Sequence, residues 1–347
     1  MRSTSVLLLS ATLGLAGVPA AARAHQAFTV ERVPVSHLSG GDVVIDDRRG
    51  LALVADRYAA ANPPPQPSVS VVDVRRQRQV GSISLAAAAP VDIGGVLVPH
   101  VPSGLDADVR RGLVVTTNSA AGSVAVMGVR GAAADPRDFV RVGAHPYGVA
   151  VDEARGLAYV SSYGEHRIDV VDVRRREVVD AIGGVRAPTR LALDARRGRL
   201  YVGNADRSTD ARHEMAVIDT RRRIVLGAVA VDANSRPAVD EASGAVYAAS
   251  FATGRVVRFA PGAALTPRAA VETATTPHGL GVDPRRRLLY APNLQAGTVT
   301  VLDAATLAVR ATLSVPGVPL GVDVDARSGR AWISLRDASA LAVIEPR

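Results

Sequence analysis

Six polar side chains lie at equivalent points of an internal repeat and could form a binding site: Tyr147, Arg190, Arg236, His278, Asn204 and Asn293. The first four come four or five residues before an aspartate that marks each copy of the repeat, and the two asparagines come ten residues after one. Guanidinium, imidazole, phenol and amide groups together suit an anionic or polyhydroxylated ligand. The sequence therefore predicts a ligand site, provided that the fold brings the copies together.

Linear catalytic motifs are missing from the sequence. It contains no Gly-x-Ser-x-Gly, no glycine-rich phosphate loop with a lysine, and no His-Glu-x-x-His. Cysteine is absent, which excludes thiol catalysis, thiolate metal sites and covalent c-type haem. The single tryptophan argues against the repeated tryptophan docking of a quinoprotein dehydrogenase. These absences leave enzymatic activity uncertain and favour a binding protein without a cofactor.

The elements that must position the six side chains are copies of one repeat. Each copy contains an aspartate, three further residues, usually a glycine, and then a β-strand with an aromatic or branched residue. Asp and Gly at this spacing are typical of a tight β-hairpin, in which the carboxylate accepts turn N–H groups and the glycine takes a positive φ. The anchoring aspartates are Asp46, Asp108, Asp152, Asp194, Asp240, Asp283 and Asp325.

The spacing of the anchors predicts the fold. Each copy holds four short apolar segments separated by turn residues, with almost no helical periodicity, which indicates a four-stranded antiparallel sheet. Seven such sheets bury their faces by packing radially around a channel. The last copy stops after its third strand, and an orphan β-segment at 28–36 can complete it. We therefore expect residues 25–347 to form one all-β domain, a seven-bladed β-propeller closed by its N-terminal strand.

A family resemblance follows from the same motifs. The Pro-x-Gly-Val entry, the Asp-x-x-x-Gly hairpin, the Tyr-Val-Gly-Asn sequence at 201–204 and the Ala-Val-Ile-Asp strand at 216–219 resemble YVTN-type β-propeller repeat proteins, including the exported YncE-like branch. The resemblance covers essentially all of residues 25–347. It implies the fold and leaves the activity open, because such propellers have unrelated functions.

In an antiparallel blade, the connections between blades and those between the second and third strands share one face, here called the mouth face. All six side chains named above would surround the channel entrance on that face. A metal site assembled from His145, His278 and a carboxylate stays open, although no histidine pair has a local chelating spacing. Such a site would make the protein a metal-dependent hydrolase or lyase of the propeller-lactonase type.

The opposite face, here called the back face, carries paired arginines in its turns, such as Arg48–Arg49 and Arg110–Arg111. All 41 basic residues of the chain are arginines, and the formal net charge is +8. Salt-sensitive binding of nucleic acid or an anionic glycan is therefore a second alternative. The scarcity of aromatic residues in these turns argues against a dedicated binder of single strands.

The N-terminus predicts export. A basic start, an apolar stretch at 6–18 and the small-residue site Ala22-Arg23-Ala24 form the plan of a signal peptide over residues 1–24. No other segment is apolar enough to span a membrane. Two insertions, at 62–67 and 85–100, enlarge the first copy. The leading interpretation is a monomeric periplasmic or secreted scaffold whose mouth face binds a protein or a small anionic ligand.

Overall fold

The computed structural model describes residues 28–36, 41–56, 67–85, 102–131, 133, 135–205, 213–262, 264–274, 276–336 and 338–347, and the backbone of 91–93 and 96–98. The signal peptide predicted for residues 1–24 lies outside the described residues, as does most of the two insertions.

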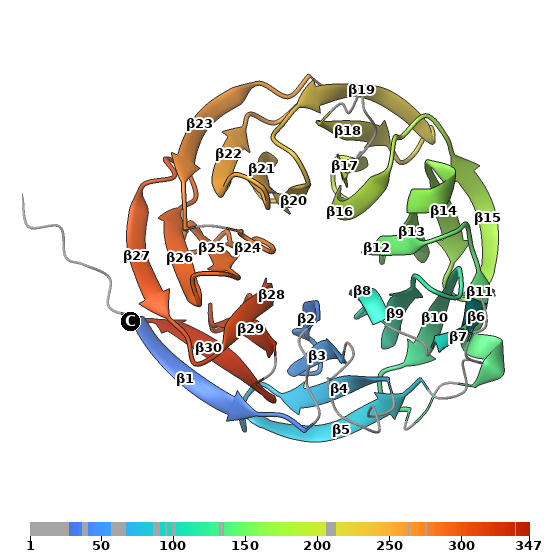
Figure 1. The fold of residues 1–347 in the computed structure, drawn as a ribbon, viewed down its shortest axis with the longest axis horizontal. Helices are drawn as coiled ribbons and strands as arrows, with labels where there is room; N and C mark the ends of the chain where they lie inside the picture. The colour runs from blue at the N-terminus through green and yellow to red at the C-terminus, as the bar shows by residue number, and fades with distance from the viewer. Residues whose placement is uncertain are drawn as a thin grey trace, which may run out of the picture.

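Seven antiparallel sheets of four strands each are arranged in a ring (Figure 1), which confirms the predicted seven-bladed propeller. Within a blade, the first strand lies nearest the channel and the fourth lies outermost (Figure 1).

Blade one consists of β2 (Val43–Asp46), β3 (Leu51–Asp56), β4 (Ser68–Asp73) and β5 (Arg78–Ser84). Blade two consists of β8 (Pro102–Asp108), β9 (Leu113–Asn118), β10 (Ser123–Gly128) and β11 (Phe139–Arg141). Blade three consists of β12 (Pro146–Asp152), β13 (Leu157–Ser162), β14 (Arg167–Asp172) and β15 (Glu177–Ile182). Blade four consists of β16 (Pro188–Asp194), β17 (Arg199–Asn204), β18 (Glu214–Asp219) and β19 (Ile224–Ala230). Blade five consists of β20 (Ser235–Asp240), β21 (Ala245–Ser250), β22 (Arg255–Phe259) and β23 (Pro267–Glu272). Blade six consists of β24 (Gly281–Asp283), β25 (Leu288–Asn293), β26 (Thr298–Asp303) and β27 (Val309–Ser314). Blade seven consists of β28 (Val318–Val324), β29 (Ala331–Arg336), β30 (Ala340–Pro346) and β1 (Phe28–Pro34). A separate hairpin joins β6 (Val91–Ile93) to β7 (Val96–Val98), and two 3₁₀ turns, η1 (Pro136–Asp138) and η2 (Tyr163–Glu165), complete the described elements.

The ring closes as the sequence predicts. β1 pairs antiparallel with β30 along its whole length, from Phe28 opposite Pro346 to Pro34 opposite Ala340. Val33 and Val35 are buried in a cluster that also contains Trp332 of blade seven and Val54 of blade one. The N-terminal segment therefore completes one blade and packs against the next.

The hairpin between the first two strands has the predicted conformation in every blade. The residue four after each anchor has a positive φ, including Arg287 (φ 58°), which stands where the other six copies have glycine. The anchor carboxylate accepts a turn N–H, as Asp194 Oδ1 does from Arg197 N at 2.9 Å. The repeated Asp-x-x-x-Gly motif is thus a turn motif, and its conservation between copies has a local structural cause.

Arginines of these hairpins also form hydrogen bonds to the neighbouring blade. Arg197 Nη1 donates both to Asp194 Oδ2 and to the backbone oxygen of Glu241 in the next blade, at 2.9 Å each. The same bridge from an anchor aspartate to the following blade is made by Arg49, Arg111 and Arg286. Four arginines of the back face therefore connect adjacent blades, and buried anchor aspartates neutralise their charge.

Arg197→Ala should lower the free energy of unfolding by about 1–3 kcal/mol, because it removes two bonds and leaves the fully buried carboxylate of Asp194 without its cationic partner. Chemical denaturation measures this loss. Arg196→Ala is the matched control, because Arg196 is an exposed neighbour on the same turn and its loss should cost less than about 0.5 kcal/mol. Equal effects of the two substitutions would show that the Arg197 hydrogen bonds do not stabilise the contact between blades.

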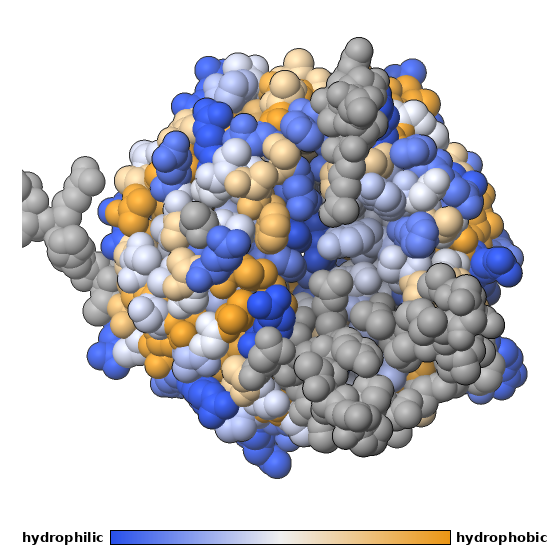
Figure 2. Space-filling view, in the orientation of Figure 1, coloured by the Kyte–Doolittle hydropathy of each residue, from blue (hydrophilic) through white to orange (hydrophobic). Residues whose placement is uncertain are grey.

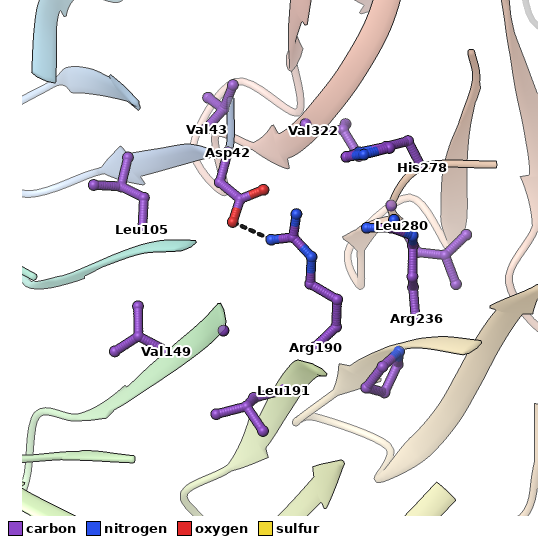
Figure 3. Close-up of a pocket in the computed structure, with 14 residues that line it drawn as sticks. Asp42, Val43, Leu105, Val149, Arg190, Leu191, Arg236, His278, Leu280 and Val322 are labelled. Carbon is purple, nitrogen blue, oxygen red and sulfur yellow. Dashed lines mark hydrogen bonds and ion pairs between the residues drawn. The ribbon is translucent and has the colours of Figure 1, made fainter. Parts of the chain in front are cut away.

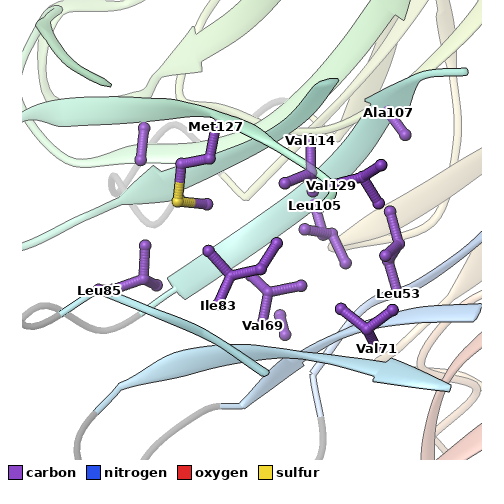
Figure 4. Close-up of a cluster of buried hydrophobic side chains, with 12 residues drawn as sticks. Leu53, Val69, Val71, Ile83, Leu85, Leu105, Ala107, Val114, Met127 and Val129 are labelled. Carbon is purple, nitrogen blue, oxygen red and sulfur yellow. The ribbon is translucent and has the colours of Figure 1, made fainter. Parts of the chain in front are cut away.

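The core lies between the blades. Figure 4 shows one cluster, in which Leu53, Val69 and Ile83 of blade one face Val114 and Met127 of blade two. The residue seven after each anchor is buried in all seven blades, as Leu53, Val115, Tyr159, Tyr201, Tyr247, Tyr290 and Trp332. The apolar faces of adjacent sheets are thereby removed from water and hold the first strands around the channel.

Candidate anion site at the channel mouth

A cavity of about 160 Å³ lies on the axis of the ring. Figure 2 shows a hollow at the centre of the molecule with hydrophilic residues on its visible wall. Each blade contributes one apolar residue, three positions before its anchor, to the collar of the cavity (Figure 3): Val43, Leu105, Val149, Leu191, Pro237, Leu280 and Val322. The collar provides a low-dielectric wall around the polar groups.

The charged residues of the cavity occupy the next position towards the mouth, four residues before the anchor. Four blades have glycine there, and a Cβ on Gly104 would lie 2.5 Å from the backbone oxygen of Tyr147 in the next blade. The other three blades have Arg190, Arg236 and Asp42. These three copies depart from the close-packed glycine pattern, and each places a charged side chain at the cavity.

Arg190 reaches across the channel from blade four to blade one. Its Nη1 donates to the Asp42 carboxylate, and the two side chains are 12% and 21% exposed. The register of β16 against β17 shifts between Pro188 and Leu191, so Arg190 lies inside an irregularity of the kind that redirects a side chain. The guanidinium lies 5.1 Å from the centre of the Tyr147 ring. Strand irregularity, ion pair and ring contact together hold Arg190 in the cavity.

Arg236 points into the same cavity from blade five and is only 5% exposed. Its guanidinium lies 5.2 Å from the centre of the Phe251 ring, which meets the His278 ring edge-on at 6.1 Å between centroids. Among the described residues, Nε and Nη1 of Arg236 and Nε and Nη2 of Arg190 are buried without a hydrogen-bond partner. Both arginines therefore line the cavity and keep buried guanidinium nitrogens without a hydrogen-bond partner in the described part of the chain, although the Tyr147 side chain lies close to both.

The two arginines, Arg190 and Arg236, carry more positive charge than the nearby carboxylate of Asp42 neutralises. Burial, followed by the like charge of Arg190, lowers the pKa of Arg236 to about 10. Burial also acts to lower the pKa of Arg190, but the Asp42 carboxylate and the Tyr147 hydroxyl outweigh it and raise that pKa. Both guanidiniums remain charged at neutral pH, and against the single carboxylate of Asp42 they leave one net positive charge.

Two further buried carboxylates, Asp106 and Asp323, lie on the first strands of blades two and seven and are not part of the cavity lining. Asp106 accepts the N–H of Val151, and Asp323 accepts that of Ile45, so each bridges its own blade to the next. Burial raises the pKa of Asp106 to about 7 and that of Asp323 to about 6. Both carboxylates keep much of their negative charge at neutral pH, so the net charge of one refers only to the groups that line the cavity, Asp42, Arg190 and Arg236.

A second pocket, of about 330 Å³, opens on the mouth face and is lined mainly by blades three and four, with Ser119 from blade two and Asn234 from the connection into blade five. Tyr147 and Thr189, each next in sequence to a residue that lines the channel cavity, belong to its wall. The residue eleven places after the anchor adds Tyr163 from blade three and Ala205 from blade four. We call this space the mouth pocket; it adjoins the charged cavity at Tyr147 and Thr189.

Of the remaining predicted residues, the two histidines line one space each and the two asparagines line neither. Asn204 and Asn293 are buried at the ends of their strands, where Asn204 Oδ1 accepts from Glu214 N and Asn293 Nδ2 donates to Thr300 Oγ1. His278 lines the channel cavity, whereas His145 lines the mouth pocket. Within the described part of the chain, no group of three or more potential metal ligands comes together. A ligand-binding role for the two asparagines stays a prediction.

Comparison with known proteins supports the fold. No family model and no curated protein matches the chain. Among solved structures, it is similar to Kuenenia stuttgartiensis hydrazine synthase (TM-score 0.73, 16% identity, 90% of this chain and 97% of that one). It is also similar to the β-propeller domain of Myceliophteria thermophila Cps50 (Swd1) (0.70, 9%, 90% and 98%) and to a chain of the Mitotic Checkpoint Complex (0.72, 12%, 99% and 98%). These likenesses show the β-propeller fold alone.

Sequence reasoning missed three residues of the site. Asp42 holds the same place relative to Asp46 as Arg190 does to Asp194, so the repeat register could have found it. Tyr163 and Phe251 each lie one residue beyond the end of the second strand of a blade, β13 and β21. No helix among the described residues is long and apolar enough to cross a membrane.

Proposed function

We propose that this propeller is a binding scaffold that holds a small monoanionic ligand in its channel, against Arg190 and Arg236. Two buried guanidiniums that line one cavity with a single carboxylate, and four of whose nitrogens have no hydrogen-bond partner among the described residues, support this proposal most directly. An isolated buried charge is costly, and a bound anion would supply both the missing charge and the missing hydrogen bonds. The small volume of the cavity favours a small anion over a protein segment.

Sodium acetate provides a direct test, because acetate is a small anion that offers a planar carboxylate. At equal ionic strength, acetate should raise the melting temperature of the protein above its value in sodium chloride, since a ligand that binds only the folded state stabilises it. In Arg236→Met the acetate-dependent shift should vanish, while the exposed back-face variant Arg222→Met should keep it. An equal shift in Arg236→Met and in the unsubstituted protein would refute the proposed site.

We also propose that the protein acts outside the cytoplasm, as a member of the exported YncE-like branch of YVTN propellers. The signal-peptide pattern of residues 1–24 supports export, and the repeat motifs support the branch. N-terminal sequencing of the mature protein tests export: a chain that begins near His25 is expected, and a chain that keeps residues 1–24 would refute it.

A further inference from the structure

We infer that the ligand is a sugar acid, a hexuronate-like monocarboxylate whose carboxylate lies between Arg190 and Arg236 and whose hydroxylated ring fills the mouth pocket. This inference rests on the proposed function and names the ligand class of the same site.

The two spaces are neighbours, because consecutive residues line one and then the other. The Tyr147 ring lies against the Arg190 guanidinium, and the same residue lines the mouth pocket. Thr189 and Arg190 are consecutive residues, one at the mouth pocket and the other at the channel cavity. The inferred ligand would extend across this boundary, with its charged end at the channel cavity and its neutral body in the mouth pocket.

The channel end suits a carboxylate. The unused donors of Arg190, Nε and Nη2, form the edge of the guanidinium that binds a carboxylate through two parallel hydrogen bonds. Because Asp42 already neutralises one of the two arginines, a ligand with one negative charge balances the cavity. A second negative charge on the ligand would face Asp42 without a further cation.

The mouth pocket suits hydroxyl groups. The Thr189 hydroxyl donates to Gly203 O at 3.0 Å, and the Tyr163 hydroxyl donates to Ala205 O at 3.5 Å. Both oxygens keep lone pairs for a donor from the ligand. Asn234 adds an amide that can both donate and accept. The described wall contains no aspartate, glutamate or arginine, so the body of the ligand is recognised there by hydrogen bonding and shape.

Isothermal titration with four probes tests the inference: glucuronate, glucose, acetate and benzoate. Glucuronate should bind at least about tenfold more tightly than acetate, since two or three additional hydrogen bonds provide that margin. Glucose should not bind measurably, because it lacks the carboxylate. Tyr163→Phe and Thr189→Val should each weaken glucuronate binding by about three- to tenfold more than they weaken acetate binding. Thr312→Val, on the exposed outer strand β27, is the matched control.

The outcomes separate this inference from the proposed function. Acetate binding that depends on Arg236, with no gain for glucuronate, would overturn the sugar-acid assignment and leave the anion site intact. Tighter binding of benzoate than of glucuronate would overturn it in favour of an aromatic acid. Failure of every carboxylate to bind would refute the anion site itself, and the sugar-acid assignment with it.

Discussion

A chain that begins at residue 37 should unfold at a much lower temperature than one that begins at residue 25, or should aggregate. Residues 28–34 supply the fourth strand of blade seven, and their removal exposes the whole hydrogen-bonding edge of β30. It also removes Val33 and Val35 from the core, at about 1.5–3 kcal/mol each. Domains are typically stable by about 5–15 kcal/mol, so the loss takes a large share of the total. Thermal unfolding followed by circular dichroism, with size-exclusion chromatography, measures the effect.

Complementation with a peptide provides the control for this experiment. A synthetic peptide of residues 25–36 should bind the shortened chain and restore much of its melting temperature, because the edge of β30 is ready to pair. The same peptide with Val33→Glu and Val35→Glu should fail, since both side chains are buried against Trp332. An unchanged melting temperature after deletion would show that β1 does not close the ring.

The fold was predictable because its signals are local and repeated. The anchor Asp and the glycine four residues later dictate a turn by their own chemistry, and seven copies at similar spacing leave few architectures open. The closing strand followed from counting strands at the two ends. Arg287 shows the limit of this reasoning: it takes the positive φ of the glycine position, because the rest of the hairpin imposes it.

The site was predictable only in part. The repeat register placed Arg190, Arg236 and His278 near the channel, since all are close to an anchor. The pairing of Arg190 with Asp42 could not be predicted, because it joins residues 148 positions apart in sequence across the ring. Asn204 and Asn293 were selected from their place at strand ends, where short polar side chains also serve the adjoining turn, as their hydrogen bonds show.

Two substitutions at the channel should change stability in opposite directions. Arg236→Met should raise the free energy of unfolding by about 1–4 kcal/mol, because it replaces an unbalanced buried charge by an apolar side chain of similar length. Asp42→Asn should lower it by about 2–4 kcal/mol, because two buried guanidiniums then face each other without a carboxylate. Urea denaturation of both variants in a buffer free of carboxylates measures the two changes.

The pH dependence of these changes follows from the pKa of Arg236. That pKa is lowered to about 10, so the charged form is the one that the fold disfavours, and its cost is fully present at every pH below about 10. The gain in Arg236→Met should therefore be constant between pH 6 and pH 8. A loss of stability in Arg236→Met as large as that in Asp42→Asn would show that Arg236 holds the apo fold together. If Arg236→Met is more stable and no longer binds acetate, Arg236 destabilises the fold and is needed for ligand binding.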